Sequence, residues 1–564
     1  MSFFACLRYF CSTRYKLFIG CIIVASFAFR YIVPSNVLLG TSYDDWLGIH
    51  LANNLQQWKW LGDWEIRTLM KGPGYSLFIA PLKTFGINPV FAIHGIYLVA
   101  LWLLINSFLN LFRPSSMSAF LKVVTFSVGS LNPVIFSADF SRLYRTSLYP
   151  CLVLISIALY AQFFSTFDRE RKHSRKKLLI LVFLGLCLGF STITRPEAKW
   201  QVYFMVVLFS IHSVRFIMNE SEISINFRKA VSRGLLMLLI LSLAIMSPSL
   251  IVKSINKNVY GVSTVENYFS GPFSDVIGTL SSIEPRNDAR MYVPISQTQL
   301  DRAYQASPIF ATLKPFLEYA DTWEKETSCA QGVACDTSAS WITFEIRDAA
   351  MSQEQFLNEK EFQDFFSSID KELKDSCKNQ SLNCGSSGLA TGLVPLKYFD
   401  WDRVISLLIQ SSRVLTDYSF SPQKQPQPTV LIEKIWPEWE NTITPLREDS
   451  LPSSTPEAIS AVLKILNYIF VLVSVILLFS FLFKLKSIKN RLMQFAAHQR
   501  TNIFFLHVLV FGLLIMNLIT SAIGDSSFGF TQPTTVYLIT GSFCYLAIQL
   551  LLVCSMLPSI DDSD

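Results

Sequence analysis

Long apolar runs recur along this chain, and they constrain its fold more than any other feature. Of 564 residues, 51% are apolar and only 16% are charged, which departs from ordinary water-soluble domains. A helix needs roughly 20 apolar residues to cross a hydrocarbon core about 30 Å thick. By this criterion we place about ten spans, near residues 17–34, 89–112, 118–137, 147–166, 178–194, 200–217, 234–252, 459–483, 502–522 and 534–556. The spans at 118–137 and 200–217 are the weakest. The sequence therefore predicts a mainly α, polytopic transmembrane helical bundle.

The positions of Lys and Arg predict which side of the membrane each loop occupies. Short loops rich in these residues stay in the cytoplasm. Basic clusters occupy residues 8–16, 169–177, 228–233 and 484–500. If the spans alternate, all four clusters share one side, both termini are cytoplasmic, and residues 35–88, 138–146, 195–199 and 253–458 lie outside. The net charge of +6 thus reports topology. No stretch interleaves basic and aromatic residues, so we expect no nucleic-acid partner.

The same reading divides the chain into four parts. Residues 1–252 form an N-terminal membrane module with an external loop at 35–88, and residues 253–420 form a soluble α or α+β external domain. In that domain the apolar spacing from Glu359 to Cys377 predicts an amphipathic helix. Residues 421–458 read as a Pro-rich linker, whose Trp436 and Trp439 either anchor in the headgroup layer or stack on a sugar ring. Residues 459–564 supply the C-terminal membrane helices.

Four cysteines fall in the external segment as two close pairs. Cys329 lies near Cys335, and Cys377 lies near Cys384. Local disulfides are expected for such pairs in an oxidising compartment. The alternative is one zinc site built from all four, although no His lies close to either pair.

Two adjacent carboxylates, Asp44 and Asp45, follow the first span. A carboxylate at the polar face of a bilayer can act as general base toward an incoming hydroxyl group. Neighbouring side chains on a helix diverge by about 100°, so we expect only one of the two to face a site. The alternative is that they cap the helix expected from Trp46 to Leu55, because Asp is a favoured N-cap residue.

Two further external segments place a cation at the membrane face. Lys71 precedes residues 72–74, a Gly-Pro-Gly run that permits a tight turn. Its ammonium group either meets a phosphate or extends to the lipid headgroups. Arg195 precedes Glu197 directly after the fifth span, where a mutual ion pair that stabilises the turn is the simpler interpretation.

The loop between the third and fourth spans carries two arginines. Arg142 and Arg145 flank Tyr144, and on a helix this spacing places both cations on one face. Arginine pairs suit phosphate groups. The alternatives are binding of lipid headgroups and pairing with Asp139.

Taken together, these segments resemble a group of bacterial membrane proteins with the GT-C glycosyltransferase architecture. The resembling segments in the membrane module are 43–45, 60–62, 68–74, 142–145, Tyr149, 194–197 and Trp200. Those in the external segment are 260–262, 270–273, 302–304, 344–349 and the Cys377 and Cys384 pair. The resemblance runs from about residue 40 to about residue 400 and leaves the last three spans unsupported. Related sequences tend to have two acids after the residue matching Arg195, whereas this chain has Pro196 and then Glu197.

The resemblance implies an inverting glycosyltransferase of the bacterial inner membrane, with its large domain in the periplasm. The donor is a sugar linked to a polyprenyl phosphate, and the acceptor is a glycan, a lipid or a protein. The implied base is Asp44 or Asp45. The implied phosphate ligands are Lys71, Arg142, Arg145 and Arg195, with Tyr144 and Glu197 in support. No cofactor is certain from the resemblance, and a divalent metal ion is possible but not indicated.

Three other functions compete with this expectation. The first is a polysaccharide polymerase or ligase with a lipid-diphosphate donor, which calls for more than one arginine-rich external loop. The second is a lipid or glycan transporter, whose spans usually carry ionisable residues or repeated halves; here the spans are nearly free of charge and show no repeat. The third is a structural or receptor role for the external domain.

Overall fold

The computed structural model describes residues 14–33, 44–112, 118–167, 175–221, 227–285, 290–319, 336–337, 341–353, 356–388, 391–417, 455–494, 497–530 and 532–556. Throughout these residues the regular secondary structure is helical, and no strand forms beyond an isolated bridge between Ile283 and Cys384. The prediction of a mainly α fold is confirmed. The predicted Cys329 and Cys335 pair, together with Trp436 and Trp439, lies outside the described residues.

Nine helices of the described chain are long and apolar enough to cross a membrane. They are α2 (Tyr15–Ile32), α5 (Pro89–Phe112), α6 (Ser118–Ser130) with the following turn η1 (Pro133–Phe136), α8 (Arg145–Phe167), α9 (Arg175–Thr194), α11 (Phe227–Tyr260), α21 (Thr455–Gln494), α22 (Ala497–Ser527) and α23 (Thr535–Met556). The expected span near 200–217 is also helical, as α10 (Ala198–Ser221), but α10 is not one of these nine. The chain has the helices of a multi-pass membrane protein.

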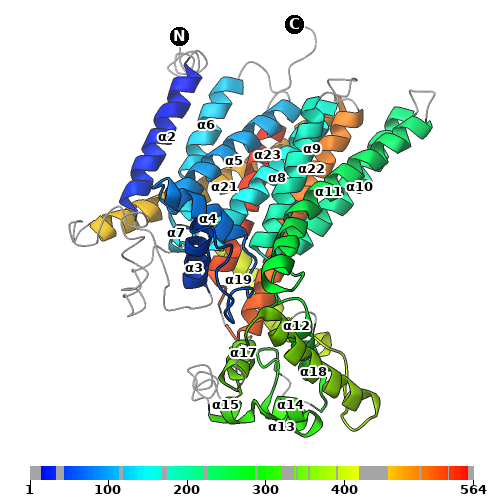
Figure 1. Cartoon of the computed structure of the whole chain (residues 1–564). Coiled ribbons are helices and arrows are strands. Elements are labelled where there is room, and N and C mark those ends of the chain that lie inside the picture. The colour runs from blue at the N-terminus through cyan, green and yellow to red at the C-terminus, as the bar shows by residue number, and fades with distance from the viewer. Residues whose placement is uncertain are drawn as a thin grey trace, which may run out of the picture.

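The long helices form one bundle, and the shorter helices gather at one end of it (Figure 1). In the first loop these are α3 (Asp45–Gln56) and α4 (Gly74–Thr84), and before α8 comes the single turn α7 (Ala138–Ser141). Beyond this end lies an outer helical domain, whose buried core also includes Leu47 and Leu51 of α3. Its helices are α12 (Pro272–Ser282), α13 (Gln297–Ala306), α14 (Pro308–Ala311), α15 (Lys314–Tyr319), α17 (Trp341–Gln353) and α18 (Glu359–Lys378).

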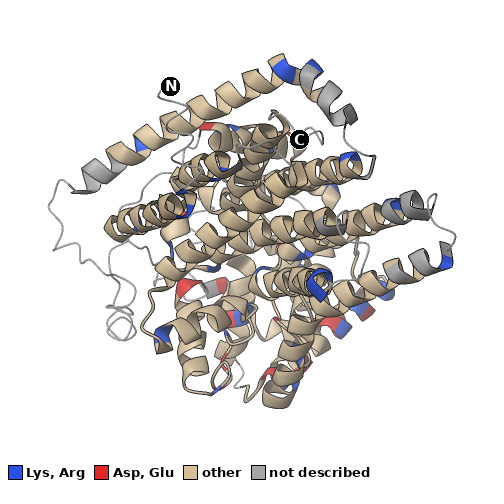
Figure 2. Ribbon diagram, turned by 90° about the horizontal axis from the view of Figure 1, so that it is seen from above, with Lys and Arg blue, Asp and Glu red and all other residues tan. Residues whose placement is uncertain are grey.

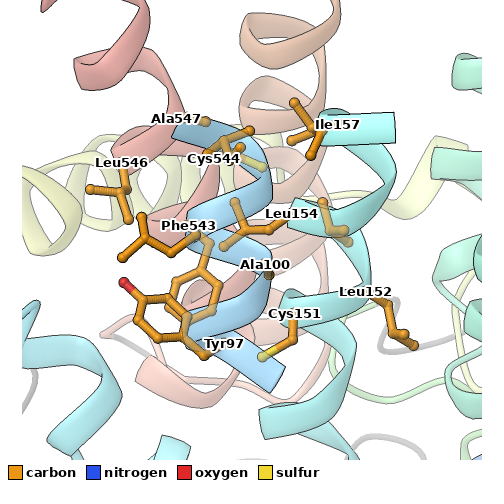
Figure 3. Close-up of a cluster of buried hydrophobic side chains, with 14 of the residues drawn as sticks. Tyr97, Ala100, Cys151, Leu152, Leu154, Ile157, Phe543, Cys544, Leu546 and Ala547 are labelled. Atoms are coloured by element: carbon orange, nitrogen blue, oxygen red, sulfur yellow. The ribbon is translucent and has the colours of Figure 1, made fainter. Parts of the chain in front are cut away.

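Close packing in the bundle centres on α5, α8 and α23, whose apolar side chains interlock (Figure 3). Tyr97, Cys151 and Phe543 of these helices are almost fully buried in this core. Helices α9 and α11 approach closely because α9 has glycines at the contact. A Cβ added to Gly185 would lie 2.5 Å from the Cβ of Ala244, and one added to Gly189 would lie 2.3 Å from a backbone oxygen of α11. Such small residues four apart let membrane helices pack tightly.

The outer surface of the bundle is apolar. Leu235, Leu239 and Leu243 of α11 are each more than half exposed, and the long helices carry few charges along their lengths, with Lys and Arg near the ends of several (Figure 2). In water such a face would need a cover, whereas a bilayer solvates it. Helices α9 and α11 each begin in a basic segment, at the end where the predicted sidedness places the cytoplasm.

The outer domain is built on the amphipathic helix that the sequence predicts. Helix α18 buries Phe362, Phe366, Ile369 and Leu373 against a core shared with α12, α13 and α17, so this prediction is confirmed. The Cys377 and Cys384 pair forms a disulfide after α18, with 5.6 Å between the Cα atoms. That bond is the expected one, and it precludes a zinc site that uses these two sulfurs.

Helix α19 (Trp401–Asp417), which the predicted boundaries assign to the outer domain, also packs on the last membrane helices. Helix η2 (Leu396–Tyr398) leads into α19, which packs on α22, α23 and α21 and also contacts Met291 and Tyr292 of the outer domain. Val404 and Leu407 of α19 are buried in a small core that includes Ala522 of α22. Helix α11 runs beyond residue 252 and ends at Tyr260, whose hydroxyl donates a hydrogen bond to the carbonyl of Gly62.

Candidate functional site

The two adjacent aspartates lie where α3 begins and have different surroundings. Asp44 occupies the N-cap position of α3, yet its side chain makes no capping hydrogen bond to the helix. The capping alternative therefore does not account for this residue. Asp45, the first residue of α3, is 1% exposed and belongs to the protein interior. Only one of the two faces a cavity, and that residue is Asp44. The two side chains diverge although Asp44 precedes the helix and has non-helical backbone angles.

Asp45 holds Arg142 in a buried ion pair. The Nε of Arg142 donates to Oδ1 and Oδ2 of Asp45 at 3.0 and 2.9 Å, and a terminal nitrogen donates to Oδ1 at 2.7 Å. The Asp45 side chain is fully buried. Arg142 sits outside the regular helices, and its attraction to Asp45 outweighs burial and raises the pKa of the guanidinium above its ordinary value. Asp45 therefore positions Arg142 and has no open face for a substrate.

Asp44 faces a different set of partners. Its Oδ1 accepts a close contact from the Lys71 ammonium and a hydrogen bond of 2.9 Å from the Tyr144 hydroxyl, while Oδ2 lies 3.7 Å from Arg142. Burial alone would raise the pKa of Asp44, but Lys71, followed by Arg142 and Arg145, holds that pKa well below its ordinary value. Asp44 is thus an ionised carboxylate, and its side chain is 34% exposed.

Lys71 reaches Asp44 because its loop packs on the end of α9. A Cβ added to Gly72 would lie 2.3 Å from the carbonyl oxygen of Ile193, and one added to Gly74 would lie 2.4 Å from the Oγ1 of Thr194. Neither glycine has a positive φ, so backbone freedom in the left-handed region is not what requires glycine here. They are needed for close approach to α9, and this approach sets the Lys71 loop beside Arg195.

The outer domain holds the same loop from its other side. Arg347 of α17, which is fully buried, donates from Nε to the carbonyl of Ile66 at 2.9 Å and from a terminal nitrogen to Oδ1 of Asn267 at 2.9 Å. The backbone N–H of Asn267 donates to the carbonyl of Leu69 at 2.8 Å. The loop that ends at Lys71 is therefore fixed between the outer domain and the bundle.

Arg142 and Arg145 come together around an aromatic ring and not on one helix. The turn α7 ends at Ser141 and α8 begins at Arg145, and Arg142 between them is extended. The expected shared helical face was wrong. Instead, the guanidinium carbons of Arg142 and Arg145 lie 4.6 and 5.4 Å from the centre of the Tyr144 ring, and the Lys71 nitrogen lies 5.4 Å from it. The Tyr144 hydroxyl also accepts from the Nε of Arg145 at 3.1 Å.

Arg195 forms the ion pair that the simpler interpretation expected. Its Nε and a terminal nitrogen donate to the two carboxylate oxygens of Glu197 at 3.2 and 2.8 Å. Burial opposes ionisation, but Arg195 and then Arg145 lower the pKa of Glu197 to about 2. The guanidinium carbon of Arg195 lies 5.7 Å from the centre of the Tyr149 ring. Arg195 and Glu197 therefore support each other and also face the shared cavity.

A single cavity of about 1880 Å³ connects these groups. Asp44, Lys71, Arg142, Tyr144, Arg145, Arg195 and Glu197 all line it, together with residues of the outer domain and of α10, α22 and α23. The last two spans, for which the resemblance gave no support, thus supply part of the wall. Thr535 at the start of α23 donates a hydrogen bond to Asp139 of α7 and so ties that wall to the site. Asp139 therefore pairs with Thr535, not with the arginines.

Sequence reasoning did not assign several of these lining residues a role. They include Thr146, Gln201 and Tyr537. Gln201 accepts a hydrogen bond from the Tyr149 hydroxyl. Hydropathy predicts that these helices span a membrane but does not indicate which of their residues face a cavity. For Gln201 the one available signal was a polar residue within an apolar run.

Within the cluster of sequence-predicted residues, the charges nearly balance. Lys71, Arg142 and Arg195 each have a carboxylate oxygen within 4.0 Å, from Asp44, Asp45 and Glu197 respectively. Among the described residues, Arg145 has no such partner, and its side chain donates one hydrogen bond, to Tyr144. The cluster therefore carries one positive charge in excess, located on an arginine that lines the cavity.

No three His, Cys, Asp or Glu side chains come together as possible metal ligands within the described part of the chain. Comparison of the chain with known proteins found no matching family model, no similar curated protein and no similar solved structure.

Proposed function

We propose that this protein is a membrane glycosyltransferase that moves a sugar from a polyprenyl-phosphate donor to a hydroxyl-bearing acceptor at the non-cytoplasmic face. One observation carries the proposal. An ionised carboxylate, Asp44, and a cation without a carboxylate partner, Arg145, share the hydroxyl of Tyr144 in one cavity. Membrane helices and the outer domain both wall that cavity, so a lipid-linked donor and a water-soluble acceptor can meet there.

The excess charge favours a phosphodiester over a diphosphate donor. The phosphate of a sugar linked to a polyprenyl phosphate is a diester with one negative charge, which the single excess cation on Arg145 balances. A lipid diphosphate brings at least one more negative charge. An arginine fork is well suited to hold two phosphate oxygens at once.

Asp44 is the group that receives the acceptor proton. The acceptor oxygen attacks the anomeric carbon from the side opposite the phosphate, the bond from that carbon to the phosphate oxygen breaks, and its electron pair stays on the phosphate. The acceptor proton passes to Asp44. A low pKa makes a weak base, but a bound phosphate competes for Lys71 and so raises the pKa of Asp44 toward its ordinary value.

The products restore the charge balance. The leaving phosphate becomes a monoester and gains one negative charge, while the protonated Asp44 loses its own. Lys71, which contacts Asp44 in the resting protein, is then free to pair with the phosphate. The departing group is a stable anion held by cations, so no strong general acid is required.

The test is sugar transfer in proteoliposomes that hold the purified full-length protein and radiolabelled polyprenyl-phosphate sugars. We expect Asp44→Asn to reduce transfer by about 10²-fold or more, as loss of a general base does. Asp63→Asn is the matched control, because Asp63 is an exposed carboxylate of the same loop that does not line the cavity. Unimpaired transfer by Asp44→Asn removes Asp44 as the base. Transfer by the wild type only from lipid-diphosphate sugars contradicts the donor class.

A further inference from the structure

Helix α8 begins at the wall of the cavity and presents its N-terminus there. Arg142, Tyr144, Arg145, Thr146 and Tyr149 all line the cavity, so it is the first turn of α8 that borders it. The first amide groups of any helix lack partners inside the helix. Among the described residues, the backbone N–H groups of Arg145 and Thr146 have no hydrogen-bond acceptor. With the partial positive charge of a helix N-terminus, such groups favour an anion.

A second and independent observation comes from the side chain of Thr146. This residue is only 1% exposed, and its hydroxyl is buried without a hydrogen-bond partner in the described chain. Buried hydroxyl groups almost always have a partner, so one without a partner needs an explanation. Thr520, a threonine of α22 that lines the same cavity, shows the usual state, because its hydroxyl donates to the carbonyl of Met516 at 2.9 Å.

The cation of this turn completes the set of donors. Arg145 has no carboxylate partner among the described residues and uses one of its five N–H groups, on Nε, to bind Tyr144. Arg142 is different, because three hydrogen bonds commit it to Asp45. The first turn of α8 thus offers two backbone N–H groups, one hydroxyl and one guanidinium. Several donors around a single positive charge fit the two free oxygens of a phosphodiester.

We propose that the donor phosphate binds at the N-terminus of α8, with Thr146 as a ligand that hydrogen-bonds a phosphate oxygen. This inference rests on the proposed function and adds a place and a residue to it. Tyr144, directly before α8, donates to Asp44, so a phosphate in this position sets the anomeric carbon beside the base. Arg142 then acts as a positioning residue, and Arg145 is the cation that contacts the phosphate.

The test measures binding of polyprenyl phosphate without a sugar to the purified full-length protein in detergent. Thr146→Val keeps the shape of the side chain and removes its hydroxyl, Thr146→Ser keeps the hydroxyl, and Thr520→Val is the matched control. We expect Thr146→Val to weaken binding about tenfold, as for one hydrogen bond to a charged group, while the other two variants stay within about twofold of the wild type. Equal binding by Thr146→Val and the wild type overturns the proposal.

Two further experiments distinguish a donor phosphate from other phosphates, and distinguish failure of the phosphate site from failure of the proposed function. Phosphatidylglycerol and inorganic phosphate are tested as competitors. If either competitor binds as strongly as polyprenyl phosphate, and Thr146→Val weakens its binding equally, the site is a general phosphate site and not a donor site. If the wild type transfers no sugar but Thr146→Val loses polyprenyl phosphate binding, the phosphate site is supported and the proposed function is contradicted. Transfer by Thr146→Val with an unchanged KM for the donor contradicts the site and leaves the function standing.

Discussion

Replacing Asp44 and Asp45 separately by Asn should damage the protein in two different ways, although the residues are neighbours. Asp44 faces the cavity and is 34% exposed, whereas the Asp45 side chain is completely buried against Arg142. We expect Asp44→Asn to reduce sugar transfer by about 10²-fold or more with little loss of stability. We expect Asp45→Asn to lower the stability of the whole protein and to reduce transfer as a consequence.

The magnitudes follow from burial. Removing one partner of a buried ion pair leaves the other charge uncompensated and costs about 3–5 kcal/mol. Asn at position 45 retains one carbonyl oxygen that can accept from Arg142, so we expect the lower end of that range. An ion pair that solvent reaches contributes at most about 1 kcal/mol, so the loss of the Lys71 contact at Asp44 should change the free energy of unfolding by no more than this.

The assay combines denaturant unfolding in detergent with sugar transfer by the same preparations. A double variant, Asp45→Leu with Arg142→Met, adds a test of mechanism, since replacing both partners by apolar residues often restores stability. If Asp45 acts only through Arg142, the double variant should recover stability but not transfer. Equal losses of stability in the two single variants would refute the reasoning from burial. A stable Asp45→Asn protein without transfer would make Asp45 the base.

Further predictions concern pH and the loop that carries Lys71. The pKa of Asp44 is well below its ordinary value, so protonation of Asp44 should not lower kcat/KM of the wild type between pH 7 and about pH 5. Lys71→Met should raise the pKa of Asp44, and kcat/KM of that variant should fall toward low pH. Glu197 stabilises the fold when it is ionised, fully so above the ordinary pKa of a glutamate, and this contribution should be lost as pH falls toward about 2. In acid unfolding experiments the stability of Glu197→Gln should therefore depend less on pH than that of the wild type. Gly74→Ala places a Cβ 2.8 Å from a backbone nitrogen of α9 and should destabilise the protein by about 1–3 kcal/mol in the same unfolding assay. Arg347→Met removes the side chain that donates a hydrogen bond to the carbonyl of Ile66 and should lower kcat/KM. Arg347→Lys should lower kcat/KM less. Equal activity of both variants and the wild type would contradict a positioning role.

Hydropathy foresaw the membrane helices because crossing a bilayer is a property of each segment alone. The same holds for α18, where the spacing of Phe362, Phe366 and Leu373 defines one buried face. These successes share one cause, which is that the deciding interaction lies within a single helix.

The site geometry escaped prediction where partners distant in sequence decide it. Gly72 and Gly74 were assigned to a tight turn, but the surface they must fit belongs to α9, more than a hundred residues later. Arg142 and Arg145 would share a face only on one helix, yet Arg142 is an extended residue between α7 and α8, and its side chain pairs with the distant Asp45. The wall from α22 and α23 lies still further away in the chain.

The difference in burial between the ion pairs determines which of them can respond to a ligand. Exchanging the partner of Lys71 costs at most about 1 kcal/mol because solvent already reaches Asp44, so an arriving phosphate can take the lysine and leave the carboxylate more basic. The pair of Arg142 with Asp45 is too costly to open, at about 3–5 kcal/mol. Arg142 therefore supplies a constant field beside Tyr144, while Lys71 moves its charge between base and phosphate. Because Lys71 lowers the pKa of Asp44 more than Arg142 does, substitution of Lys71 should shift the pH dependence of transfer further than substitution of Arg142.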